Sequence, residues 1–374
     1  MTPKEKTNGT KLASFEEAIK QTTALGGKKH LALGNGFSIG TNPLFKYGTL
    51  FEQAKETGLL PAHVLQLFER YGTSNFEEVL RQLDEGVWLA DHYKLKRTSK
   101  KRDMRTDYDS LKKSLVETIS KVHPALPSDV GEDKLKACAA FINQFDSIYT
   151  LNYDLLLYWS SLTTGDFPFE DGFGREVDTD DDYCVFLSTG SDERHLYFLH
   201  GALHLYVEGG EVRKRVWNTT GIRLMEQVRE ALDSKRYPLV VSEGNSPDKK
   251  RHIEASSYLS YCWRKLENIQ GSLFIYGHSL SEQDQHVLDA IALNTTLSNL
   301  FVGVHGDFES ARNRKLIKRA YSIADKRRSV LESGRTGRRI KKQPLNIYFF
   351  DSKTVHLWEQ SVLPAKCIIQ TQEE

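Results

Sequence analysis

No stretch of this sequence approaches the roughly 18 to 20 consecutive apolar residues that a helix needs to cross a bilayer. The polar start MTPKEKTNGTK also lacks the apolar region of a signal peptide. We therefore expect neither a membrane-spanning nor a secreted protein, and we predict a cytoplasmic location.

The sequence also lacks an excess of charge of one sign, and it lacks closely spaced cysteine pairs. The 51 basic and 50 acidic residues leave a net charge of +1, which argues against a protein built as a whole to wrap nucleic acid. The cysteines lie far apart, without the CxxC pair that is typical of zinc sites and redox motifs, at Cys138, Cys184, Cys262 and Cys367. We expect reduced thiols and no bound metal.

The composition is that of a soluble globular protein, with 39% hydrophobic and 27% charged residues among 374. Strand-like runs alternate with helical stretches, at residues 31–33, 146–154, 196–201, 238–244, 272–280, 299–307 and 345–352. This alternation predicts an α/β fold with a mostly parallel sheet and helices on both faces. Such sheets bind ligands at the carboxyl ends of their strands, so chemistry is expected there.

A long helical segment interrupts the alternation. Between residues 50 and 122 apolar residues recur every three or four positions, as in FEEVLRQL, and β-branched runs are nearly absent. We predict a helical insertion at residues 50–137, set in a core formed by residues 1–49 and 138–374.

Two basic segments stand out, Lys94 to Arg105 and Arg312 to Lys342. The plain interpretation of each is a solvated surface. The alternatives are a partner or phosphate surface for the first, and nucleic acid or an acidic protein face for the second. Direct nucleic-acid binding therefore stays open.

The first strand runs into a glycine turn with Gly34, Gly36 and Gly40 in a GxGxxxG pattern. Glycine lets the backbone approach a diphosphate, whose charge is met by amides at a helix start. The spacing misses the dehydrogenase GxGxxG pattern, because Ile39 occupies the third glycine position. Taken alone, the pattern fits a plain tight turn equally well.

Two further strands end in residues that could carry chemistry. Asn152 in TLNYD could hold a ribose hydroxyl or a water by donating and accepting together, or it could cap a helix. His200 in YFLHG could be a general base, or a structural histidine with its hydrogen bonds satisfied. His204 is a weaker candidate.

A fourth motif, IYGHSLSEQD, contains Gly277, Ser279, Leu280 and Asp284 after a strand. A glycine-serine turn offers amides and a hydroxyl to phosphate or ribose oxygens. Helix capping by Ser281 explains the same residues without a ligand.

These motifs, in this order, resemble those of the sirtuin-like NAD-binding family. GNGFS resembles the family's GAGxS diphosphate loop, TLNYD its asparagine motif, LHG its histidine motif and GHSLSEQD its late ribose-phosphate turn. Asn35 stands where alanine is usual, which leaves contacts made by backbone amides intact. The resemblance implies a Rossmann-like sheet with NAD across the strand ends.

By this resemblance, NAD is the substrate and no metal is required. Asn152 would position water or ribose, and His200 would act as the base. Asp154 would orient the ribose or cap the next helix. The expected NAD-binding residues are Gly34, Asn35, Gly36, Phe37 and Ser38 on the diphosphate side, and Gly277, Ser279, Leu280 and Asp284 on the adenosine side.

The acceptor of the ADP-ribosyl group decides the function. Protein-deacylating sirtuins carry a zinc module with paired cysteines, which this sequence lacks. Water as acceptor gives an NAD hydrolase, the activity of sirtuin-like effectors of bacterial antiphage defence, which the chain resembles in its large helical insertion and missing zinc module. That resemblance implies a homo-oligomer and a HerA-type ATPase partner or, with less support, an Argonaute. Two alternatives stay open, a sensor of NAD or ADP-ribose without turnover and a lysine deacylase lacking zinc.

Overall fold

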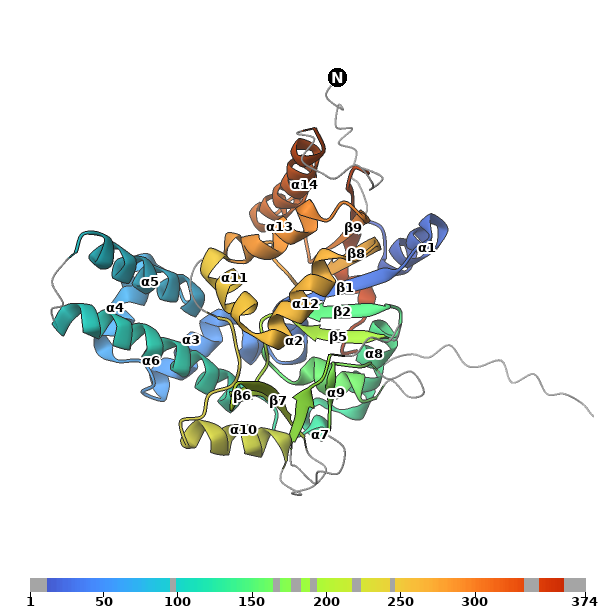
Figure 1. Ribbon diagram of the computed structural model, residues 1–374. Coiled ribbons are helices and arrows are strands. Elements are labelled where there is room, and N and C mark those ends of the chain that lie inside the picture. Colours follow the sequence, from blue (N-terminus) through green and yellow to red (C-terminus); the bar gives the residue numbers. More distant parts are fainter. Residues whose placement is uncertain are drawn as a thin grey trace, which may run out of the picture.

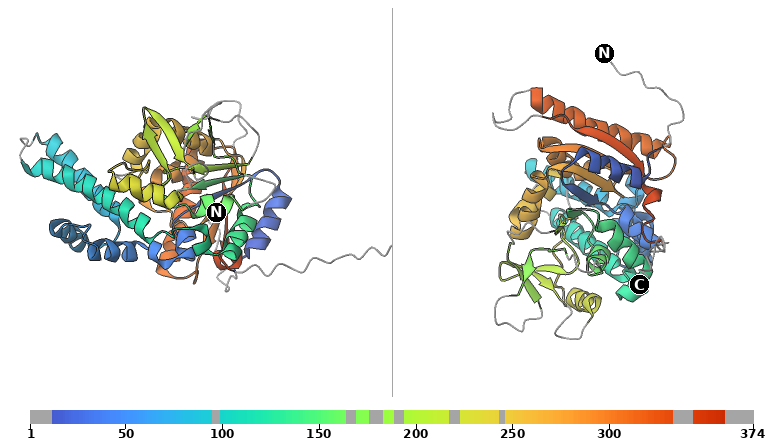
Figure 2. Two further views of the ribbon diagram at one scale, coloured as in Figure 1. Left: turned by 90° about the horizontal axis from the view of Figure 1, so that it is seen from below. Right: turned by 90° about the vertical axis from the view of Figure 1, so that its right-hand side faces the viewer.

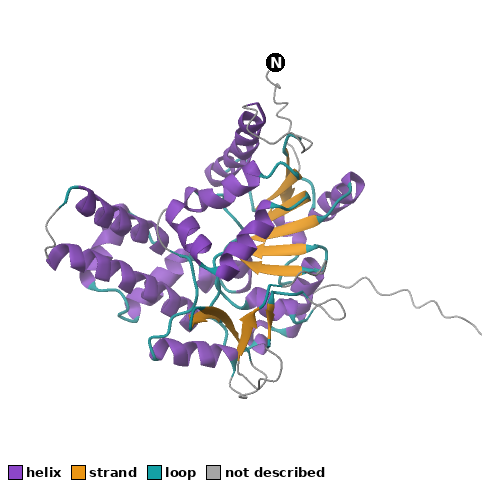
Figure 3. Cartoon of the chain, in the orientation of Figure 1, coloured by secondary structure: helices purple, strands orange, loops and turns teal. Residues whose placement is uncertain are grey.

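In the computed structural model the chain forms a parallel sheet, a smaller antiparallel sheet and many helices (Figure 3). The structure describes residues 12–94, 99–163, 169–175, 183–188, 194–216, 223–242, 246–332 and 343–359. Within these residues no helix has the length and apolar character to cross a membrane. Of the cysteines, Cys138, Cys184 and Cys262 are free, and Cys367 lies outside the described residues.

The larger sheet has six strands in the order β10-β9-β8-β1-β2-β5, and every pairing is parallel. Its strands are β1 (Lys29–Leu33), β2 (Ser147–Thr150), β5 (His195–Phe198), β8 (Gly271–Tyr276), β9 (Leu297–Val304) and β10 (Asn346–Asp351). The interior strands β8, β1 and β2 and the edge strand β5 are almost wholly buried, as is typical of parallel sheets covered on both faces. The predicted fold class is confirmed.

The register shows which helices cover which face. Phe274 is aligned with Leu31 and lies on the same face; its ring is 6.1 Å from that of Phe15 in α1 (Phe15–Leu25). Tyr197 is aligned with Tyr149 and so with Ala32, one position after Leu31, and its side chain therefore lies on the opposite face. The Tyr197 ring lies 6.0 Å from that of Tyr261 in α12 (Ser257–Glu267). Alternation of side chains along the strands therefore gives each face its own helical layer (Figure 1).

The predicted strand at 238–244 is wrong over residues 238–242, and residues 243 and 244 lie outside the described residues. Val240 forms only an isolated antiparallel bridge with Gly201. The backbone of this segment bonds to the loop after β5 instead, for example from the Val241 N–H to the His200 carbonyl at 2.9 Å. Val240 and Val241 are buried beside that loop, whereas Leu239 is only partly buried. The apolar run therefore reflects burial and not a strand of the sheet.

Sequence reasoning missed the smaller sheet, which has the antiparallel order β3-β4-β7-β6. Its strands are β3 (Phe173–Gly174), β4 (Tyr183–Phe186), β6 (Leu205–Glu208) and β7 (Glu211–Arg215). Gly209 and Gly210 join β6 to β7, and both have positive φ, as a two-residue hairpin turn requires. This glycine pair was the signal that could have found the hairpin.

Helices α3 to α6 extend to one side of the larger sheet (Figures 1 and 2). We call this group the helical arm; its members are α3 (Tyr47–Glu56), α4 (Ala62–Tyr71), α5 (Phe76–His92) and α6 (Ser99–Val122). The predicted division into a helical insertion at residues 50–137 and a core stays a prediction. Helix α8 (Glu132–Ile142) runs across the boundary predicted between residues 137 and 138. Part of the first basic segment, residues 95–98, lies outside the described residues.

The other elements connect these parts. They are α2 (Gly36–Thr41), η1 (Pro43–Phe45), α7 (Pro127–Val130), α9 (Leu156–Ser161), α10 (Leu224–Asp233), α11 (Ser246–Ala255), η2 (Glu282–Asp284), α13 (Gln285–Leu293), α14 (Ala311–Glu332) and η3 (Ser352–Val355). Helix α14 contains the start of the second basic segment; residues 333–342 lie outside the described residues.

The strand order places a crevice at the middle of the larger sheet. From β1 the chain adds β2 and β5 on one side, and it later adds β8, β9 and β10 on the other. The connections after β1 and β8 therefore diverge, which opens a crevice at the carboxyl ends of these two strands. Gly34 follows β1 there, and Gly277 follows β8.

Candidate active site

A cavity of about 370 Å³ lies at this crevice. It brings together residues from all four sequence motifs, namely Gly34, Asn35, Gly36, Asn152, Asp154, His200, Gly277, Ser279 and Asp284. The helical arm contributes to the wall through Tyr47, Asn75 and Glu77 among others. Strand ends far apart in the sequence and the arm therefore form one site.

Three predicted NAD-binding residues, Phe37, Ser38 and Leu280, have buried side chains that do not line the cavity. The Phe37 carbonyl accepts a hydrogen bond from Trp358 Nε1 at 2.8 Å. His204 is buried elsewhere, stacked on Tyr158 at 4.8 Å, and neither of its ring nitrogens has a partner among the described residues.

The glycines of the first motif are explained by close backbone packing. A Cβ on Gly36 would lie 2.6 Å from the Gly277 Cα, and one on Gly34 would lie 2.8 Å from the Gly277 carbonyl oxygen. A Cβ on Gly40 would meet Trp358 at 2.9 Å. Any side chain at the first two positions would force the turns after β1 and β8 apart.

The same packing uses up several amides of the loop. The Gly36 N–H donates to the Gly277 carbonyl at 2.8 Å, and the Phe37 N–H donates to the Gly34 carbonyl at 2.9 Å. The Gly34 N–H donates to the Tyr276 carbonyl at 3.0 Å. Fewer amides face a ligand than the sequence motif predicts, so a bound diphosphate would need another source of positive charge.

Arg312 supplies such a charge. It lines the cavity from the start of α14, beside the turn that contains Gly277 and Ser279. Its side chain is exposed and forms no hydrogen bond or ion pair with the described part of the chain. One residue of the second basic segment thus reaches the site, which its sequence context did not reveal.

Asn152 follows β2 and is held by its amide nitrogen. Nδ2 donates to the Gly34 carbonyl at 3.1 Å and to Ser38 Oγ at 3.0 Å. A carbonyl oxygen only accepts, so the Gly34 contact identifies this atom as nitrogen. With both of its N–H groups used, Asn152 can only accept toward a ligand, through Oδ1. The sequence predicted that Asn152 both donates to and accepts from a ligand; in the structure it can only accept.

Asp154 lines the cavity, but its carboxylate is hydrogen-bonded to other residues of the protein. It accepts a hydrogen bond from the Ser38 hydroxyl and another from the Leu156 backbone N–H at 3.0 Å. Burial raises the pKa of its carboxyl, and these hydrogen bonds partly oppose that rise. The carboxyl connects the start of α9 with the serine that orients Asn152.

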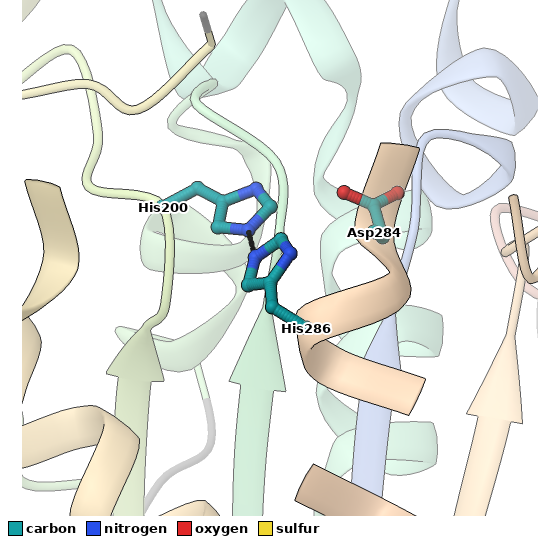
Figure 4. A group of neighbouring side chains, drawn as sticks. All are labelled: His200, Asp284 and His286. Atoms are coloured by element: carbon teal, nitrogen blue, oxygen red, sulfur yellow. Dashed lines mark hydrogen bonds between the residues drawn. The ribbon is translucent and has the colours of Figure 1, made fainter. Parts of the chain in front are cut away.

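His200 follows β5 and pairs with His286 of α13, a residue that sequence reasoning missed. Their Nε2 atoms are 3.0 Å apart, and the rings stack at 5.2 Å (Figure 4). His286 Nδ1 lies 3.2 Å from Ser246 Oγ. Burial lowers the pKa of His200 well below its usual range and that of His286 to about 4. Both rings are therefore neutral at neutral pH.

A buried charge network, also missed, ties the helical arm to the core. Lys249 Nζ lies 2.9 Å from Glu77 Oε2 in α5 and 3.3 Å from Asp284 Oδ1. His278 Nε2 lies 3.0 Å from Asp284 Oδ2. Burial alone would raise the pKa of Asp284, but Lys249 and His278 outweigh it and hold that pKa well below its usual range.

The ligand atoms of His200, His286 and Asp284 lie within 4.8 Å of one another, close enough to be considered for a metal ion. However, both carboxylate oxygens of Asp284 are already engaged, one of them by the ammonium group of Lys249. Adding a divalent cation beside a buried ammonium would be opposed by repulsion at low dielectric. The expected absence of a metal stays a prediction.

The fold and the crevice define a Rossmann-like α/β protein with a candidate ligand site at its topological switch point. Its sequence from residue 31 to 358 matches the profile of the DUF4917 family, described as a domain of unknown function, and the chain belongs to that family. No curated protein sequence matches it.

A search of solved structures finds a chain described as "Structural Basis for the Mechanism and Regulation of Sir2 Enzymes". The two share 11% sequence identity with a TM-score of 0.34, over 85% of this chain and 99% of the other. The likeness is weak, so the fold class rests on the sheet topology.

Proposed function

We propose that this protein binds NAD in the crevice and hydrolyses the bond between nicotinamide and ribose, releasing nicotinamide and ADP-ribose. One observation carries the proposal: four separate motifs, read from the sequence as NAD-binding and catalytic, line a single cavity at the switch point. Asn152 and His200 come from different strand ends, yet both border that cavity.

In the proposed reaction the C1′–N bond breaks and the ribose gains oxocarbenium character. Asn152 Oδ1 accepts a hydrogen bond from the attacking water or from a ribose hydroxyl and so fixes its position. His200, neutral at neutral pH, takes a proton from that water as it attacks C1′. NAD and water thus give nicotinamide, ADP-ribose and one proton.

A second candidate function is an NAD or ADP-ribose sensor without turnover. It is favoured by the low basicity of the buried His200 and by the number of loop amides already bonded to protein. It predicts binding without product. The proposal of a zinc-independent lysine deacylase predicts instead that nicotinamide release depends on an acylated peptide.

The biological setting is proposed on the sequence resemblance alone. We propose a cytoplasmic antiphage-defence effector that depletes NAD when it is activated in a homo-oligomer or with a HerA-type ATPase, an Argonaute ranking second. Exposed aromatic residues on the helical arm, Trp88 and Tyr93, offer a surface for such a partner.

The test is chromatographic measurement of nicotinamide and ADP-ribose after incubation with NAD. Asn152→Ala and His200→Ala should each abolish release, whereas Asn268→Ala and His63→Ala, matched changes at exposed positions away from the cavity, should not. Measurable NAD binding without release by wild type under any condition would reject the hydrolase and favour the sensor.

A further inference from the structure

The bond between His200 and His286 determines which atom of His200 can meet a ligand. Its Nε2 is used at 3.0 Å by His286 Nε2. Its Nδ1 has no hydrogen bond among the described residues, and His200 borders the cavity. In Figure 4 the Nδ1 edge of the ring is turned away from His286. The ligand-facing atom is therefore Nδ1.

Two neutral imidazoles can bond through Nε2 atoms only if one of them carries the proton. If His286 carries it, His200 must hold its own proton on Nδ1 and can only donate to a ligand. If His200 carries it, Nδ1 is free to accept a proton, and His286 then donates its Nδ1 proton to Ser246 Oγ. Only the second arrangement makes His200 a base toward the cavity.

We propose that His286 is a positioning residue that holds His200 with Nδ1 toward the cavity and receives its Nε2 proton during the reaction. This inference rests on the proposed hydrolase function. In the step, a water proton passes to His200 Nδ1, and the proton on His200 Nε2 passes to His286 Nε2. His200 ends neutral, His286 ends as the imidazolium, and the water oxygen bonds to C1′.

The charges around the pair favour this direction. The groups facing His286 are Lys249 of α11, Asp284 of η2, His278 before η2, Asp289 of α13 and His200 itself. At His200 the repulsion that the Lys249 ammonium exerts on a positive charge is larger than the attraction from the Asp284 carboxylate. At His286 the attraction from Asp284 is larger than the repulsion from Lys249. A positive charge is thus better placed on His286 than on His200.

Ser246 holds His286 in place. Its hydroxyl oxygen accepts a hydrogen bond from the His286 backbone N–H at 2.5 Å. The same oxygen lies within hydrogen-bonding distance of His286 Nδ1, at 3.2 Å. Trp263 stacks on the imidazole at 5.6 Å and 20°. The ring that would receive the proton is therefore held on its edge and on its face.

The experiment compares wild type with His286→Phe and His286→Asn, using His30→Phe as a matched control. His30 is also buried, but it bonds to Ser147 and Gln270 and does not line the cavity. We expect kcat to fall by up to about 100-fold in both His286 variants, because a misplaced base loses the value of its orientation. KM should stay nearly unchanged, and the control should keep wild-type kcat.

A second measurement does not depend on turnover. Long-range ¹H–¹⁵N spectra of the histidine rings should show His200 protonated on Nε2 and His286 protonated on Nδ1 in wild type, and a changed His200 tautomer in His286→Asn. A wild-type protein that hydrolyses no NAD would defeat the hydrolase proposal, and these spectra would still decide whether His286 positions His200.

Two results would overturn the inference. One is an unchanged kcat, pH profile and His200 tautomer in folded His286→Asn. The other is a stoichiometric divalent metal, found by elemental analysis of the purified wild type and lost in both His286 variants, since the two histidines would then be ligands.

Discussion

Replacing Lys249 by methionine should destabilise the protein strongly, because this lysine neutralises two buried carboxylates. Its side chain has no exposed surface, and those of Glu77 and Asp284 are 8% and 13% exposed. Methionine fills similar volume without charge, so the variant leaves two like charges facing each other in a poorly solvated site.

Removing one partner of a buried ion pair typically costs about 3–5 kcal/mol of unfolding free energy. An unfolding entropy of about 2.1 cal/mol/K per residue in a 374-residue chain converts this loss to a fall in Tm of about 4–6 °C. Differential scanning calorimetry at pH 7 measures it directly.

The loss should depend on pH. In wild type the pKa of Asp284 is held well below its usual range, so its contribution is present above the unfolded value, about 3.9, and is lost as pH falls through the folded pKa. Without Lys249 the pKa values of both carboxyls rise, and protonation relieves their repulsion in acid. The deficit of Lys249→Met should be largest at pH 7 and should shrink toward pH 4.

Lys214→Met is the matched control, because Lys214 is a buried lysine whose ion pair with Asp171, at 2.6 Å, lies away from the cavity. It should also lose stability, because it leaves the Asp171 carboxylate without its ammonium partner. Adding Glu77→Gln to Lys249→Met should restore part of the loss. A deficit below about 1 kcal/mol at pH 7, the range of solvent-exposed pairs, would refute the reasoning that this network is desolvated.

Two further predictions concern the ligand and the histidines. Arg312→Ala should weaken NAD binding about fivefold, the effect of about 1 kcal/mol, and should reduce its salt dependence, because one cation at the cavity is removed; isothermal titration at two salt concentrations tests this, and an unchanged affinity would remove Arg312 from the site. Burial lowers the pKa values of His30, His123 and His286 to about 4. Between pH 6.5 and 4 the unfolded chain therefore binds protons that the folded chain does not, so the free energy of unfolding should fall as pH falls through this window. Denaturant titrations at pH 7 and 5 check this, and equal stabilities would contradict the assigned burial.

Local pattern was enough to predict the elements that make the parallel sheet. Short apolar runs ending in glycine or polar residues predicted β1, β2, β5, β8, β9 and β10, and the three-and-four spacing between residues 50 and 122 predicted helices. These signals depend on neighbours along the chain, because strand and helix periodicities are local properties. The same locality explains the failure at residues 238–242, where burial beside the loop after β5 gives the same apolar pattern as a strand.

The tertiary structure alone decided which side chains meet. Nothing near Glu77 or Lys249 in the sequence indicates that the helical arm and α11 converge on the strand ends. The fourth motif ends two residues before His286, but it does not indicate that this histidine pairs with His200. The tertiary structure also reassigned the glycines, since Gly34 and Gly36 are required by the approach of Gly277. Sequence determined which groups stand at the ends of the strands; strand order and packing determined their partners, their burial and therefore their protonation, because these depend on contacts between residues far apart in the chain.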